Sequence, residues 1–188
     1  MSRLHYLAAL LYLGLSLAVL GAPDVHPAVA AGPVFGGGTA AGWFQSVKPY
    51  CNSLEVDLTL QRISPPDGLE GTGYAAACLA LAGRIDAARE RILSLPESDR
   101  YKGAGIVFEV GHPVADAGDD RSAGPIMGLV VEFWPNHYMA LYHAGMAHWS
   151  LGQRAEAREF LERFLESYDV EDGWRRNAQS VLARMRGE

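Results

Sequence analysis

Two stretches of the chain, residues 74–95 and 141–168, follow the same pattern of apolar and polar positions. In each, small and apolar residues run up to a glycine, and a second run that mixes apolar with charged residues follows it. A helical apolar face that stops at glycine and then resumes is typical of two helices joined by a short turn. The pattern therefore predicts two helical hairpins, with turns at Gly83 and Gly152.

The spacing of the two turns predicts a third hairpin between them. Gly83 and Gly152 lie 69 residues apart, and Gly118 falls 35 residues after the first and 34 before the second. An alanine follows each glycine by five residues and begins the packed face of the next helix; these are Ala88, Ala123 and Ala157. A period of about 34 residues is that of a helix–turn–helix repeat.

With this period, and with Pro135 at the end of the middle hairpin, the chain resembles the tetratricopeptide repeat family over residues 69–171. The resemblance implies three units, at about residues 69–102, 104–137 and 138–171. The predicted fold is all-α, a right-handed solenoid of such helical hairpins with helices that cap its ends. The alternative is an unrelated helical bundle with coincidental spacing.

Cap helices are predicted on both sides of the repeats. Residues 50–63 carry apolar positions at helical spacing, and residues 172–186 form the second cap. Within the middle unit, Pro113 is expected to kink its helix or to end it near His112, because proline lacks the amide donor and clashes with the preceding turn. Pro125 falls in the first turn of the following helix, where proline is tolerated.

The first thirty residues differ in kind from the rest. Arg3 precedes an apolar run, and the small residues Ala28 and Ala30 follow it, as in a cleaved signal peptide. The alternative is a retained membrane anchor over residues 4–22, which approaches the roughly 20 residues that span a bilayer. Residues 31–42, rich in glycine and alanine, are predicted to be a flexible tether, and residues 43–188 to be the helical domain.

Charge and cysteine content narrow the class of partner and compartment. The formal net charge is −6, with no basic face for phosphate binding, so nucleic acid is an unfavourable partner. Cys51 and Cys78 are the only cysteines, and a pair in an exported protein favours a disulfide over two separate buried thiols. The repeat scheme supports this pairing, because it places the start of one helix against the end of the next.

No constellation typical of catalysis is found in the sequence, and we predict no enzyme, no cofactor and no metal ligand. His137, His143 and His148 are spaced by six and five residues, which does not align them on one helical face. The alternative is an ion-dependent enzyme or metal-binding module centred on the loop of His112, Asp116, Asp119 and Asp120. The structural interpretation of these acidic residues is that they cap the next helix.

The resemblance implies that the first helix of each unit lines a groove. The residues carried over to that groove are Phe108, His112, Met139, Tyr142, Met146 and Trp149. Aromatic and methionine side chains suit an apolar partner. The alternative is that the protein covers this strip itself, with the tether or a cap helix.

These observations predict a non-enzymatic exported scaffold or protein–protein interaction module. Its partner would be another protein, either an apolar peptide or helix or a subunit of a membrane complex. The expected location is periplasmic or extracellular, with membrane attachment only if the N-terminal segment is retained.

Overall fold

The computed structural model describes residues 38–187, so the predicted leader or anchor and most of the tether lie outside the described residues. Every regular element within this range is helical, which confirms the all-α prediction. The elements are α2 (Ala40–Val47), the 3₁₀ helix η1 (Lys48–Tyr50), α3 (Val56–Arg62), α4 (Leu69–Leu81), α5 (Ile85–Leu93), α6 (Glu97–Asp116), α7 (Asp120–Phe133), α8 (Tyr138–Ser150), α9 (Arg154–Ser167) and α10 (Gly173–Arg186). No helix among residues 38–187 has the length and apolarity needed to cross a membrane.

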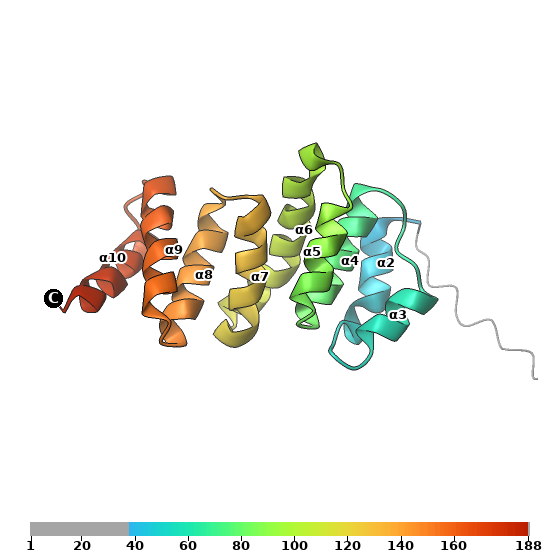
Figure 1. Ribbon diagram of the computed structural model, residues 1–188, viewed down its shortest axis with the longest axis horizontal. Helices are drawn as coiled ribbons and strands as arrows, with labels where there is room; N and C mark the ends of the chain where they lie inside the picture. The colour runs from blue at the N-terminus through green and yellow to red at the C-terminus, as the bar shows by residue number, and fades with distance from the viewer. Residues whose placement is uncertain (1–37, 188) are drawn as a thin grey trace, which may run out of the picture. The chain divides into compact units, whose positions relative to one another are not determined.

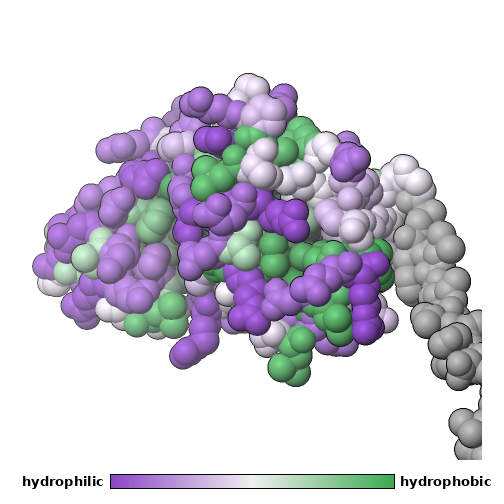
Figure 2. All heavy atoms as spheres, turned by 45° about the vertical axis from the view of Figure 1, so that its right-hand side comes forward, coloured by the Kyte–Doolittle hydropathy of each residue, from purple (hydrophilic) through white to green (hydrophobic). Residues whose placement is uncertain are grey.

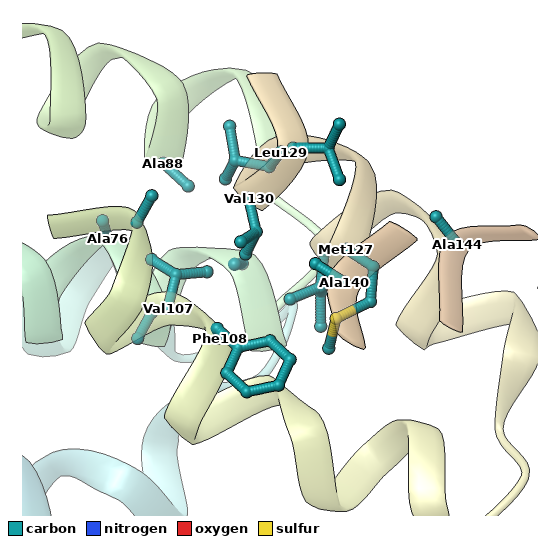
Figure 3. Packing of buried hydrophobic residues seen from close by; sticks show 14 of the residues in the cluster. Ala76, Ala88, Val107, Phe108, Met127, Leu129, Val130, Ala140 and Ala144 are labelled. Atoms are coloured by element: carbon teal, nitrogen blue, oxygen red, sulfur yellow. The ribbon is translucent and has the colours of Figure 1, made fainter. Parts of the chain in front are cut away.

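The helices pack as adjacent pairs, side by side along the described part of the chain (Figure 1). The hairpins are α4 with α5, α6 with α7, and α8 with α9, and neighbouring hairpins pack against one another. Side chains from the four helices of the first two hairpins, Ala76, Ala88, Val107 and Val130, point toward one another in the core (Figure 3). Their small size lets the helix backbones approach closely.

The three predicted turn glycines lie in equivalent turns. Gly83, Gly118 and Gly152 have φ of 74°, 77° and 76°. In each turn the glycine N–H donates to the carbonyl three residues earlier, and the next N–H donates to the carbonyl five residues earlier, at 2.9–3.2 Å. This pair of hydrogen bonds closes a helix only when one residue of the turn adopts the left-handed conformation, with positive φ. Glycine adopts it most easily. The turns of all three hairpins are therefore built in the same way.

Of the two outcomes expected for Pro113, a kink or an end of the helix near His112, the second does not occur, because α6 continues to Asp116. Proline removes only the amide that would bond the carbonyl of Glu109, and Glu109 is exposed, so water can bond that oxygen. The carbonyl of Pro113 still accepts from Ala117 N–H at 3.1 Å. At its other end α6 begins at Glu97, before the start predicted for the middle unit at residue 104.

Both ends of the hairpin stack carry additional helices. α10 corresponds to the predicted C-terminal cap, and the Asp172 carboxylate accepts from the N–H groups of Trp174 and Arg175 at its start. The N-terminal cap was predicted over residues 50–63, but within that range the α-helix α3 covers only Val56–Arg62. α2 begins at Ala40, inside the range predicted as a tether. Figure 2 turns this N-terminal side forward and shows apolar side chains exposed between hydrophilic ones; Leu54 and Leu58 are among the exposed residues.

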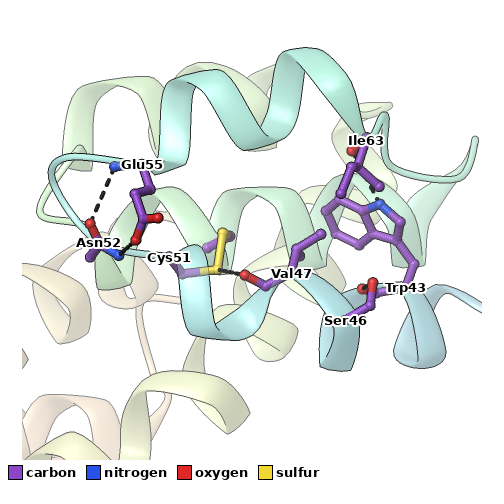
Figure 4. The surroundings of a disulfide bond; sticks show 8 residues. Trp43, Ser46, Val47, Cys51, Asn52, Glu55 and Ile63 are labelled. Atoms are coloured by element: carbon purple, nitrogen blue, oxygen red, sulfur yellow. Dashed lines mark hydrogen bonds between the residues drawn. A yellow bond between two sulfur atoms is a disulfide. The ribbon is translucent and has the colours of Figure 1, made fainter. Parts of the chain in front are cut away.

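Cys51 and Cys78 form a disulfide, as predicted (Figure 4). Cys51 follows the 3₁₀ helix instead of beginning a helix, so the repeat scheme misplaced it by one element. Its Sγ lies 3.5 Å from the carbonyl oxygen of Val47, a packing contact because a disulfide sulfur carries no proton. Nearby, the Trp43 indole N–H donates to the carbonyl of Ile63 at 3.3 Å. The bridge thus ties the N-terminal helices to the first hairpin.

Two glycines inside helices test how tightly the hairpins pack. A Cβ on Gly145 in α8 would lie 2.7 Å from Cγ of Leu161 in α9, whereas one on Gly128 in α7 would meet no atom within 4 Å. We expect Gly145→Ala to lower the free energy of unfolding by about 1–3 kcal/mol through overpacking. Gly128→Ala should raise it by up to about 1 kcal/mol through helix propensity. Urea denaturation of both variants tests this pair, and a stabilised Gly145→Ala variant would contradict it.

Candidate functional site

A cluster of two histidines and one aspartate lies where the C-terminal turn of α6 meets α8. The Nε2 atoms of His112 and His143 are 3.1 Å apart. Oδ1 of Asp116 lies 3.4 Å from Nε2 of His112 and 3.8 Å from Nε2 of His143. Two imidazole nitrogens and a carboxylate oxygen, all able to offer a lone pair, therefore converge on one point.

The helices dictate this convergence. His112 and Asp116 are four residues apart on α6, so their side chains share one face of the helix. His143 comes from α8, the first helix of the next hairpin. The exposed fraction of the side chain rises from 7% for His143 to 29% for His112 and 54% for Asp116. The cluster is therefore closed at the α8 side and open to solvent at the carboxylate.

The charge state of the cluster follows from its burial. Burial, and after it the neighbouring His112, lowers the pKa of His143, while the carboxylates of Asp116 and Asp120 oppose the shift; the resulting pKa is about 4. His143 is consequently neutral near pH 7, with one proton on its ring. A neutral ring can be a hydrogen-bond donor through one nitrogen and an acceptor or metal ligand through the other.

Aromatic rings enclose the two histidines. Phe108 stacks on His112 with ring centroids 4.8 Å apart. Trp174 of α10 meets His143 edge-on at 5.6 Å, and Tyr142 does so at 5.4 Å. The cluster thus has apolar walls and one polar opening.

The acidic loop considered from the sequence is only partly brought together. His112 and Asp116 lie in the cluster, but Asp119 caps α7 by accepting from Ser122 N–H at 3.2 Å, and Asp120 begins that helix. The structural interpretation holds for Asp119. Sequence reasoning missed His143, because it compared histidines only along one helix. The repeat period gives no direct signal for this pair, because the position equivalent to His112 is Met146, and His143 lies about one helical turn before it.

The strip predicted to bind a partner is partly covered by α10. Tyr142 is 6% exposed; its ring contacts Phe164 and Trp174 at 5.2 and 4.7 Å, and its hydroxyl accepts from Nδ2 of Asn177 at 2.6 Å. Its side chain is therefore packed inside the protein. Phe108 is also buried.

The remaining residues predicted to line the groove are partly exposed to solvent. His112, Met139, Met146 and Trp149 are all half-buried. The Met146 sulfur lies 3.7 Å from Nδ2 of Asn177, and the Trp149 ring has the guanidinium groups of Arg154 and Arg184 at 5.9 and 5.5 Å. Part of each of these four side chains is therefore exposed to solvent.

A run of aromatic side chains that the sequence did not reveal lies beside this strip. We call it the aromatic ridge; it consists of Tyr101, Trp134, His137, Tyr138 and Tyr168. Successive ring centroids along the ridge are 4.6–6.3 Å apart. Tyr101 and Tyr138 are 45% and 42% exposed, and His137 also contacts Phe108 at 4.1 Å. The ridge and the predicted groove are therefore contiguous.

Comparison with known proteins gives one family. No curated protein and no solved structure matches the chain. The family model described as tetratricopeptide repeat matches residues 139–169, which include nearly all of α8 and all of α9. The α8/α9 hairpin is thus similar to a tetratricopeptide repeat unit.

Proposed function

We propose that this protein is a non-enzymatic interaction module that binds an apolar segment of a partner protein. The observation that carries the proposal is the aromatic ridge, an uninterrupted run of rings with two exposed tyrosines, which ends at Tyr168 in the hairpin that is similar to a tetratricopeptide repeat. Exposed aromatic clusters are uncommon on proteins that act alone. They are also the side chains that contribute most to binding energy at interfaces.

The binding surface combines the ridge with the half-buried part of the groove. Met139, Met146 and Trp149 supply contact area on α8, and His112 extends it onto α6. Tyr142 and Phe108 lie beneath and hold these side chains in place. Methionine adapts its shape to an irregular partner, and aromatic rings lose little conformational freedom on binding.

All three hairpins are proposed to be tetratricopeptide-type units, since the turns at Gly83 and Gly118 repeat the hydrogen bonds of Gly152 in the matched unit. The disulfide supports the proposal that the protein is exported, because such bridges persist mainly in oxidising compartments. The protein would then act as a periplasmic or extracellular scaffold. With its N-terminal segment retained it would be an accessory subunit of a membrane complex.

The double variant Tyr138→Ala/Trp149→Ala tests the surface. The partner is first recovered by crosslinking in the native cells, and its affinity is then measured with purified protein. Loss of two aromatic anchors, typically worth about 2 kcal/mol or more each, should weaken binding at least about a hundredfold. The melting temperature should fall little, since Tyr138 is exposed and Trp149 half-buried.

Leu93→Ala is the matched control, because Leu93 is an exposed apolar residue on the second helix of the first hairpin, outside the surface. It should leave the affinity unchanged. A double variant that melts normally and binds as tightly as the unaltered chain would show that the partner docks elsewhere.

A further inference from the structure

The cluster of His112, Asp116 and His143 has the chemistry and the geometry of a metal site. Imidazole nitrogen together with a carboxylate oxygen is a donor set typical of zinc and related divalent ions. The three atoms come from two helices of different hairpins, so their approach is a product of the tertiary fold. We propose that these three side chains bind one divalent transition-metal ion, of which Zn²⁺ is the representative.

The distances support the assignment. A tetrahedral ion with metal–ligand bonds of about 2.0–2.1 Å holds its ligand atoms about 3.3 Å apart. The three separations here, 3.1, 3.4 and 3.8 Å, lie on both sides of that value. An ion can therefore be placed between them with small side-chain adjustments and without moving either helix.

A single proton on Nε2 of His112 can serve only one of its two neighbours, His143 or Asp116. The Nε2 atoms of His112 and His143 face each other, so one must be the donor and the other the acceptor. If His112 donates to His143, its single Nε2 proton is not available to Asp116. A cation in the same place would be bound by all three lone pairs at once.

The position of Asp116 points the same way. It is the last residue of α6, where the unpaired carbonyls of the helix end carry partial negative charge. A carboxylate is unfavourable there unless a positive charge lies beside it. A bound cation supplies that charge and joins the C-terminal turn of α6 to α8.

The proposal goes beyond the interaction function, because it concerns this chain without any partner. Three protein ligands leave one position on a tetrahedral ion. The cluster is open to solvent at Asp116, its most exposed member. Water completes the shell there, and the ion fixes the relative position of two consecutive hairpins.

The test is titration of the purified, metal-free full chain with Zn²⁺ alone, without a histidine tag, by calorimetry and thermal melting. We expect one Zn²⁺ per chain and a rise in melting temperature, since a ligand that binds only the folded state stabilises it. His112→Ala and Asp116→Asn should each weaken binding at least about a hundredfold and remove the rise. Loss of a residue that only orients a ligand already costs about 10–100-fold.

His148→Ala is the matched control. His148 is another histidine of α8, but it bonds to Gln153 at 2.6 Å and lies outside the cluster. This variant should bind Zn²⁺ like the unaltered chain. Since Asp116 is exposed, Asp116→Asn should fold normally, which a circular dichroism spectrum checks.

No stoichiometric binding by the unaltered chain would overturn the proposal. Equal binding by His112→Ala and the unaltered chain would do so too, because it would place the ion on other groups. The assay contains no partner protein, so its failure leaves the proposed interaction function standing. Failure of the partner-binding test likewise leaves the metal site standing.

Discussion

Replacing Tyr142 with alanine is expected to lower the free energy of unfolding by about 3–5 kcal/mol, the range for large aromatic residues in cores. The ring of Tyr142 fills the space between α8, α9 and α10, where it contacts Phe164 and Trp174. Its removal leaves a cavity at the junction of three helices. It also removes the hydroxyl that accepts a hydrogen bond from Asn177, and with it a hydrogen bond between α10 and α8.

Urea denaturation followed by circular dichroism measures this change. Tyr142→Phe is the first control and should cost only about 1 kcal/mol, because it removes the hydroxyl and keeps the packing. Tyr138→Ala is the second and should cost less than Tyr142→Ala, since Tyr138 is 42% exposed and Tyr142 only 6%. A Tyr142→Ala variant as stable as the unaltered chain would mean that this residue does belong to an open groove.

Removing the disulfide is expected to lower the free energy of unfolding by about 3.5 kcal/mol in the chain-entropy model. Cys51 and Cys78 are 27 residues apart, and the bridge limits the unfolded chain by closing the loop between them. The double variant Cys51→Ala/Cys78→Ala is the appropriate change, because both cysteines are buried and alanine adds no polar atom there. Urea denaturation of the variant and of the oxidised protein gives the difference.

Two further measurements check that the disulfide is present and that its loss causes the change in stability. Intact mass after alkylation without reductant should show no labelled cysteine in protein isolated from its native compartment. Reduction of the unaltered chain should shift its denaturation midpoint in the same direction as the double substitution. Two labelled thiols in the native protein, or a variant of unchanged stability, would contradict the expectation.

The hairpins could be predicted from the sequence because their signals are local. A glycine at positive φ is required wherever a helix closes with the bond pattern of Gly83 and Gly152, and this requirement leaves a periodic mark in the sequence. The C-terminal cap was predictable for the same reason, since Asp172 starts a helix with a clear apolar stripe. The extent of α6 was not, because proline near a helix end costs less than proline in the middle.

The candidate sites were less predictable, because they depend on contacts between helices. The sequence places Tyr142 and Trp149 on one face of α8, but it cannot tell that α10 lies over the first and leaves part of the second exposed. In the same way, the pairing of His112 with His143 requires the relative position of two hairpins. The aromatic ridge joins residues from four segments, and no single stretch of sequence shows it.

The disulfide makes the two ends of the helix stack unequal in how firmly they are held. Helical repeats touch only their neighbours, so opening begins at an end and spreads inward. The N-terminal end is closed covalently between Cys51 and Cys78, whereas α10 is held by packing and by hydrogen bonds such as that between Asn177 and Tyr142. We therefore expect fraying to start at the C-terminus, with amide protection lowest in α10 and increasing toward α4. Each such opening briefly exposes the buried face of α8, next to the surface through which we propose the protein binds its partner.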